Sequence, residues 1–164
     1  MSIRNVGVIG SGTMGNGIAH VFAQSEFSVT LVDINEDFLD RGMLAIVKNL
    51  DRQLKKELIT KTEKTAILSR INPTTGFHNL SDCDFVVEAA SENKTTKFKL
   101  FKDLDATVKP HVILSTNTSS ISITEIAAHT KRPDKVIGMH FMNPVPVMKL
   151  VEIIRGHVCS DETV

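Results

Sequence analysis

The chain has 164 residues, of which 41% are hydrophobic and 23% charged, and its 19 basic residues equal its 19 acidic ones. This length suits one globular domain with a sizeable core, and the apolar content excludes a disordered chain. The balanced charge disfavours a nucleic-acid partner, and no apolar run is long enough to cross a bilayer.

The first 33 residues predict a complete βαβ unit. A strand over about 5–9 leads into the hexad GSGTMG at 10–15, a helix follows to about Gln24, and a second strand covers Ser28 to Asp33. The crossover between these two strands is expected to be right-handed, as in nearly all such units. The chain therefore begins as an α/β protein with parallel strands.

The hexad matches the glycine pattern of a dinucleotide-binding loop. Gly10 permits the tight turn, Gly12 lets a pyrophosphate approach the backbone, and Gly15 lets the helix pack close to the sheet. Asp33 ends the second strand, where an acid reads the ribose hydroxyls in such folds. The alternative is a structural glycine turn in another α/β protein.

Residues from about 36 to 69 show only helical periodicity, and they predict a helical hairpin that projects from the sheet. Thr60 and Glu63 form a capping-box pattern that starts its second helix. Its first helix presents one apolar face made of Leu39, Met43, Ile46, Val47, Leu50 and Leu54.

The remaining chain alternates strands with helices. The pattern predicts strands near 71–77, 85–88, 112–115, 136–140 and 150–154, a helix over about 93–107, and a short helix capped by Ser122 and Glu125. Ser160 is expected to cap the start of a helix that these residues do not complete. The whole chain, 1–164, is thus predicted to be one Rossmann-type domain: a doubly wound, mostly parallel sheet with the hairpin inserted after the second strand.

Polar side chains lie at the predicted carboxyl ends of several strands. Asp33, the segment 88–92, the segment 116–120 and His140 each follow an apolar run. Because ligands of open α/β sheets bind at that edge, we expect these ends to converge on one crevice.

Three residues are candidates for roles in catalysis. His140 ends an apolar strand and could exchange protons near neutral pH, although a hydrogen-bonded core histidine fits the pattern equally well. Glu152 lies among apolar neighbours and is the natural partner of His140; its alternative is a sheet-edge charge that faces water. Ser119 could bind a substrate oxygen, or it could only satisfy the loop backbone.

A basic patch lies on the predicted hairpin. Arg52, Lys55 and Lys56 could clamp an anion, and the alternative is a solvated helix face. Cys83 and Cys159 have no metal-ligand spacing, so we expect reduced thiols in a cytoplasmic protein and no metal site. The first strand is predicted to begin almost at Met1, so we expect no signal or transit peptide.

Four stretches together give the chain its resemblance to a family. GSGTMG, the helical insertion, STNTSS and HFMNPVPVMKLVE closely resemble the L-3-hydroxyacyl-CoA dehydrogenases over nearly the whole chain. Met142 stands where that family usually has a second phenylalanine, a soft apolar change. The resemblance implies hydride transfer between NAD and C3 of an L-3-hydroxyacyl-CoA, with short chains such as 3-hydroxybutyryl-CoA favoured, in fatty acid β-oxidation or butanoate metabolism.

The resemblance also implies roles for individual residues. His140 would be the catalytic base, Glu152 its partner, and Ser119 a contact for both substrate and cofactor, while Asn49, Arg52 and Lys56 would lie along the CoA. The residues implied in NAD binding are Gly10, Ser11, Gly12, Thr13, Met14, Gly15, Asp33, Ala89, Glu92, Lys97, Ser119 and Asn143.

The family carries a second, all-helical domain after this one, which forms a homodimer and covers the substrate. That domain is expected but is absent from these 164 residues, so we expect the chain alone to turn over poorly. Two alternatives for function are another NAD-dependent hydroxyacid dehydrogenase and a non-catalytic NAD-binding or structural protein on the same fold.

Overall fold

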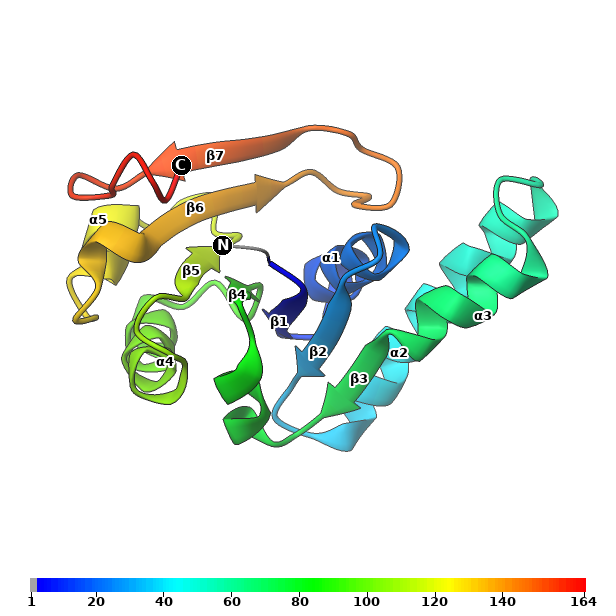
Figure 1. Cartoon of the computed structure of the whole chain (residues 1–164), viewed down its shortest axis with the longest axis horizontal. Helices are drawn as coiled ribbons and strands as arrows, with labels where there is room; N and C mark the ends of the chain where they lie inside the picture. Colours follow the sequence, from blue (N-terminus) through cyan, green and yellow to red (C-terminus); the bar gives the residue numbers. More distant parts are fainter. Residues whose placement is uncertain (1–2) are drawn as a thin grey trace.

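The computed structural model describes residues 3–164, which form one seven-stranded sheet with helices on both faces (Figure 1). The strands are β1 (Asn5–Ile9), β2 (Ser28–Val32), β3 (Ile71–Thr74), β4 (Phe85–Glu88), β5 (Ile113–Thr116), β6 (Val136–Phe141) and β7 (Val151–Arg155). The helices are α1 (Thr13–Gln24), α2 (Glu36–Lys55), α3 (Lys61–Ser69), α4 (Lys94–Thr107) and α5 (Ile123–Ala127), with 3₁₀ helices η1 (Phe77–Asp82) and η2 (Pro133–Lys135).

The strand order β3-β2-β1-β4-β5-β6-β7 confirms the predicted doubly wound fold. Every neighbouring pair is parallel except β6 and β7, which are antiparallel. The chain leaves β1 in one direction to β2 and later returns on the other side as β4. The carboxyl ends of β1 and β4 therefore flank the switch point at which such sheets bind ligands.

Alternating strand residues feed two separate apolar cores. Val6 and Val8 of β1 pack with α1 and the hairpin, whereas Ile9 packs with α4 and α5 on the opposite face. Strands buried on both faces read as short continuous apolar runs, which is how β1 and β4 appear in the sequence. The two layers of helices hold the strand ends rigidly at the polar edge.

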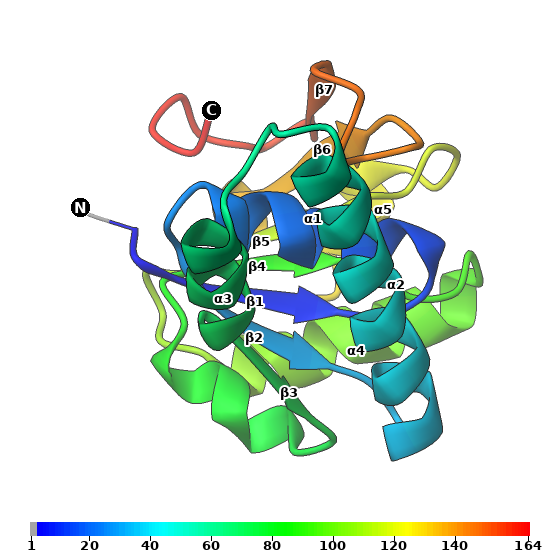
Figure 2. The ribbon, with the colours of Figure 1, turned by 90° about the vertical axis from the view of Figure 1, so that its right-hand side faces the viewer.

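The helical hairpin is confirmed over residues 36–69 and extends beyond the edge of the sheet (Figures 1 and 2). Asn35 caps α2 by accepting a hydrogen bond from the Phe38 N–H. Thr60 and Glu63 form the expected capping box at the start of α3. Three of the six predicted apolar positions on α2 are fully buried, namely Leu39, Ile46 and Leu50.

One predicted strand is shorter than expected. β3 stops at Thr74, because the Thr74 hydroxyl accepts hydrogen bonds from the Gly76 N–H and the Asn79 amide, which turn the chain into η1. Ser160 caps a single turn, through the Thr163 N–H, at the place where the start of an incomplete helix was predicted. The other boundaries lie within two residues of their predicted positions.

The predicted capping box at Ser122 forms only in part. The Ser122 hydroxyl accepts from the Glu125 N–H, as expected. The Glu125 carboxylate lies 2.7 Å from the Lys94 ammonium of α4 and does not reach back to the cap. A tertiary ion pair has thus replaced the local contact.

Both cysteines are free and buried. Burial raises the pKa of the Cys83 thiol to about 11, so this thiol is protonated at neutral pH. Between residues 3 and 164, no helix combines the length and the apolar character needed to span a membrane. Over the same residues, no cluster of three His, Cys, Asp or Glu side chains is arranged to hold a metal ion.

Candidate active site at the carboxyl edge of the sheet

The glycine loop between β1 and α1 has the backbone that its sequence predicts. Gly10 has φ +92°, in the left-handed region that favours glycine, and its N–H donates to the Val32 carbonyl at 2.8 Å. A Cβ on Gly15 would lie 1.7 Å from the Gly10 carbonyl oxygen, so helix and loop can approach only without one. A Cβ on Gly12 would meet nothing within 4 Å.

The helix start after this loop is suited to an anion. Gly12 is the N-cap of α1 and has no side chain to accept a hydrogen bond from the first turn. The N–H groups there are left without intrahelical partners, and the helix dipole adds partial positive charge. Because space is open beside Gly12, the site fits the pyrophosphate of a dinucleotide.

Asp33 follows β2 and is tied to the glycine loop. Its Oδ2 accepts from the Ser11 N–H at 2.7 Å and from the Ser11 hydroxyl at 2.6 Å, and its Oδ1 accepts from the Ile34 N–H at 2.7 Å. These three donors fix the carboxylate at the strand end, at the position predicted for a group that reads ribose hydroxyls.

A cavity of about 670 Å³ joins the glycine loop to Asp33, a size typical of small-molecule sites. Ala89 and the segment after β4 form another wall. Several lining residues were not predicted from the sequence, among them Phe38 and Arg41 from α2 and Thr96 from α4. The Arg41 guanidinium lies 4.7 Å from the centre of the Phe38 ring. The spacing of three between them, just after a helix cap, was a signal that could have found the pair.

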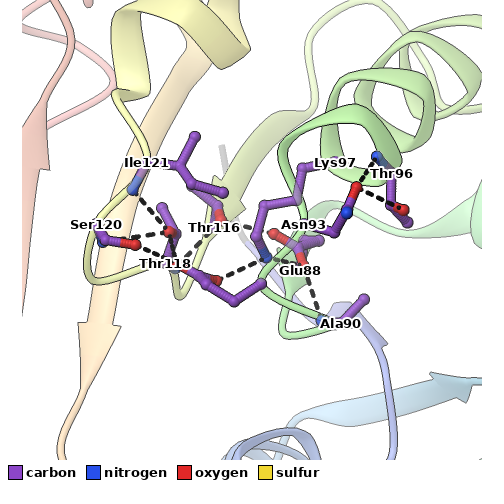
Figure 3. Close-up of polar contacts among 10 residues, drawn as sticks. Glu88, Ala90, Asn93, Thr96, Lys97, Thr116, Thr118, Ser120 and Ile121 are labelled. Atoms are coloured by element: carbon purple, nitrogen blue, oxygen red, sulfur yellow. Dashed lines mark hydrogen bonds and ion pairs between the residues drawn. The ribbon is translucent and has the colours of Figure 1, made fainter.

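A second cluster lies at the ends of β4 and β5 (Figure 3). Glu88 is completely buried, and its Oε1 accepts from the Lys97 ammonium at 2.6 Å and from the Ala90 N–H at 2.7 Å. Its Oε2 accepts from the Thr116 hydroxyl at 2.6 Å. Lys97 is only 1% exposed, so its ammonium is enclosed within this cluster.

Glu92 joins this cluster to the loop after β5. Its Oε1 accepts from the hydroxyls of Thr118 and Ser120, and its Oε2 lies 3.4 Å from the Lys97 ammonium. Burial alone would raise the pKa of Glu92, but the two hydroxyl donors and the charge of Lys97 outweigh it and hold that pKa below its usual value. Ser119, between the two hydroxyl donors, is exposed.

His140 and Glu152 form the predicted pair. They are directly opposite each other in the antiparallel β6–β7 ladder, and His140 Nδ1 lies 2.8 Å from Glu152 Oε2. Because a carboxylate can only accept, Nδ1 carries the proton and Nε2 is left able to accept one. The two side chains are 24% and 51% exposed, so the pair is open to solvent.

The structure also brings the loop after β5 to this pair. The Asn117 side-chain oxygen accepts from the Phe141 N–H at 2.9 Å, next to His140. Asn143 is exposed in the loop that follows β6. The Glu92 cluster and the histidine pair thus lie on adjacent strand ends.

The basic patch lies apart from the cavity on the hairpin. Arg52 donates to the Asn49 side-chain oxygen at 3.0 Å, and Arg52, Lys55 and Lys56 are all exposed. Within residues 3–164, none of the three cations is paired with a carboxylate. None of them lines the cavity beside the glycine loop.

A doubly wound sheet with this loop, this cavity and an acid at the end of β2 defines a dinucleotide-binding domain. The sequence model described as "3-hydroxyacyl-CoA dehydrogenase, NAD binding domain" matches residues 5–164, and the chain belongs to that family.

Curated relatives and solved structures agree with this assignment. The chain is 52% identical over 161 residues to a 3-hydroxybutyryl-CoA dehydrogenase of Bradyrhizobium diazoefficiens, which covers 98% of this chain and 55% of that protein. It is 49% identical over 156 residues to the enzyme of the same name from Clostridioides difficile, over 95% of this chain and 56% of that one.

The crystal structure of (S)-3-hydroxybutyryl-CoA dehydrogenase from Ralstonia eutropha superposes with a TM-score of 0.97 at 49% identity, over 99% of this chain and 57% of that chain. The chain therefore spans a little over half the length of the relatives that it matches.

Proposed function

We propose that this chain carries the cofactor-binding and proton-transfer half of a 3-hydroxyacyl-CoA dehydrogenase that acts on short acyl chains such as 3-hydroxybutyryl-CoA. NAD, the cofactor of this family, accepts or returns a hydride at the carbon that bears the hydroxyl. The observation that carries the proposal is the His140–Glu152 contact of 2.8 Å, placed at the same sheet edge as the dinucleotide cavity.

Different residues of the cavity bind different parts of the cofactor. The first turn of α1 after Gly12 binds the pyrophosphate through its free N–H groups, and Asp33 accepts from the ribose hydroxyls. On the side of the site nearer to β6, which carries His140, lie Ala89, Glu92, Ser119 and Asn143. Gly10, Ser11 and Thr13 line the cavity, and Met14 and Gly15 follow them in the first turn of α1.

His140 moves the proton. In the oxidation, Nε2 takes the proton of the C3 hydroxyl while Nδ1–H keeps its hydrogen bond to Glu152, so the carboxylate stabilises the imidazolium that forms. In the reduction, the same nitrogen returns the proton to the developing alkoxide. Ser119, exposed beside this pair, hydrogen-bonds the oxygen on C3 and helps to orient it.

The hairpin binds the other end of the substrate. Arg52 and Lys56 share a helix face and are exposed without a carboxylate partner among residues 3–164, which suits the phosphates of CoA. Asn49, hydrogen-bonded to Arg52, lies on the same stretch of α2.

We further propose that the open side of the histidine pair is covered by a second, helical domain that also forms a homodimer. The exposure of Glu152 and the greater length of the relatives support this. We place the protein in the cytoplasm, a reducing compartment, because Cys83 and Cys159 are both free thiols.

The test is oxidation of NADH that depends on acetoacetyl-CoA, with the wild type compared to His140→Asn. The variant is expected to lose about 10²- to 10⁴-fold in turnover, the usual contribution of a positioned acid–base group, with NADH affinity unchanged. The exposed His78, on η1, provides the matched control as His78→Asn.

A separate experiment tests whether a second domain covers the exposed side of the His140–Glu152 pair. The 164-residue chain is expected to bind NADH but to turn over slowly, and to regain rate when a helical domain from a full-length relative is added. Tight NADH binding without any turnover in that mixture would favour a non-catalytic nucleotide-binding protein.

A further inference from the structure

The buried pair Glu88–Lys97 is an unusual feature for the end of a strand. The two side chains are 0% and 1% exposed, and Lys97 Nζ lies 2.6 Å from Glu88 Oε1. Burying two charges carries a desolvation penalty, and an apolar pair of similar volume often serves stability equally well. Every side-chain contact of Glu88 is with a segment at this edge of the sheet: the start of the loop after β4, α4 and the end of β5.

One route runs from Glu88 through Thr116. The Thr116 hydroxyl donates its only hydrogen to Glu88 Oε2, so its oxygen is oriented to accept. The Thr118 N–H donates to that oxygen at 3.3 Å. Glu88 thereby determines where the chain leaves β5.

A second route runs from Lys97 through Glu92. The ammonium lies between Glu88 Oε1 and Glu92 Oε2, and Glu92 Oε1 accepts from the hydroxyls of Thr118 and Ser120. Since the Thr118 hydroxyl donates to Glu92, its oxygen also accepts, from the Ser120 N–H at 3.4 Å and the Ile121 N–H at 3.1 Å. Both routes meet at Thr118 (Figure 3).

Ser119 lies between the two held residues. Its neighbours Thr118 and Ser120 are bonded through backbone and side chain, whereas Ser119 is exposed and its hydroxyl has no hydrogen-bond partner within residues 3–164. The network thus fixes the backbone on both sides of a hydroxyl that it leaves available.

We propose that Glu88 and Lys97 are positioning residues that align Ser119 through Thr116, Glu92 and Thr118. This inference rests on the proposed function for the role of Ser119, but not for the arrangement of the loop. Lys97 acts on the loop through Glu92, since its ammonium lies between the Glu88 and Glu92 carboxylates.

The first test measures amide hydrogen exchange in the protein without cofactor. The double variant Glu88→Gln/Lys97→Met removes both buried charges together, so no unpaired charge is left, and it cuts the route through Glu92. Exchange at Ser120 and Ile121 is expected to rise about tenfold relative to the sheet, the effect of losing roughly one hydrogen bond.

The control is a second buried ion pair that does not touch this loop. Arg132 Nε lies 2.6 Å from Asp105 Oδ1, with side chains 8% and 9% exposed. Asp105→Asn is expected to lower the melting temperature without a selective rise in exchange at 118–121. Equal rises in both variants, or none in the double variant, would overturn the proposal.

The second test separates positioning from general destabilisation. Thr116→Val removes the hydroxyl that connects Glu88 to the Thr118 N–H, and Thr116→Ser restores it. Valine is expected to free the Thr118 amide to exchange and to lower kcat for acetoacetyl-CoA about tenfold with little change in KM, and serine is expected to recover both. A serine variant as impaired as the valine variant would contradict the proposal.

These outcomes separate the two proposals. Exchange is measured without substrate or cofactor, so it reports on the loop even if the wild type shows no turnover. A selective exchange response without activity would reject the proposed function and keep the positioning network.

Discussion

Two pairs of ionisable side chains at the sheet edge differ in burial, and the difference matches their proposed roles. Glu88 and Lys97 are 0% and 1% exposed, whereas His140 and Glu152 are 24% and 51% exposed. When both carboxylate oxygens of a buried ion pair accept hydrogen bonds, the pair stays in one arrangement. Any other arrangement would leave a buried charge without a partner. An open pair can receive a substrate and exchange a proton. The rigid pair and the open pair therefore lie at the same edge of the sheet, on strands β4 and β6, with β5 between them.

The largest expected effect tests this contrast directly. Lys97→Met leaves the buried Glu88 without its cation and is expected to reduce the free energy of unfolding by about 3–5 kcal/mol. Glu152→Gln is expected to cost less than about 1 kcal/mol, because its pair is exposed, while lowering kcat roughly 10²-fold. Urea unfolding and steady-state rates measure the two. Similar losses of unfolding free energy in both variants would contradict the proposed difference between the buried pair and the exposed pair.

The glycine loop offers a second contrast, between a crowded and an open position. Gly15→Ala places a methyl group 1.7 Å from the Gly10 carbonyl oxygen and is expected to destabilise the fold by at least about 1–3 kcal/mol. Gly12→Ala meets no atom within 4 Å, so it is expected to unfold at the wild-type temperature but to bind NADH weakly. Thermal unfolding and NADH fluorescence titration separate the two effects.

Asp33 is expected to make the chain prefer NAD over NADP by about one or two orders of magnitude in affinity, because its charge repels a 2′-phosphate. The structure adds a cation that the sequence analysis did not place there, since Arg41 lines the same cavity. Arg41→Ala is therefore expected to increase the discrimination. Titration with NADH and NADPH measures it, and equal affinities in the wild type would reject the role of Asp33.

The hairpin patch is expected to affect substrate alone. Reversing both charges, with Arg52→Glu and Lys56→Glu, is expected to raise KM for acetoacetyl-CoA about tenfold in an active full-length enzyme and to leave NADH affinity unchanged. Lys102, exposed on α4 and away from the hairpin, provides a control as Lys102→Glu. An unchanged KM in the double variant would mean that the patch is only a solvated helix face.

The smallest effect concerns pH. The folded pKa of Glu92 lies below its unfolded value, so its contribution to stability is present above an unfolded pKa of about 4.3 and is lost as pH falls through the folded pKa. The difference in melting temperature between wild type and Glu92→Gln is expected to be constant from about pH 8 to pH 5 and to vanish in stronger acid. A difference that changes near neutral pH would contradict this.

The short-range features of this chain could be predicted from its sequence. The glycine loop, the capping box at Thr60 and the hairpin over 36–69 depend on residues within about one helical turn of each other, or on a repeating apolar pattern. The polar strand ends could be placed at one edge because parallel strands share a direction. The contact of His140 with Glu152 was also predicted, and it is confirmed.

Only the tertiary structure decided the partners of the long-range groups. Glu125 bonds to Lys94 and not to its own cap, Arg41 reaches the cavity, and Lys97 is buried between two carboxylates. These outcomes depend on how segments far apart in the chain pack together. The free energy of a buried charge is set by its complete surroundings, which local sequence patterns do not contain.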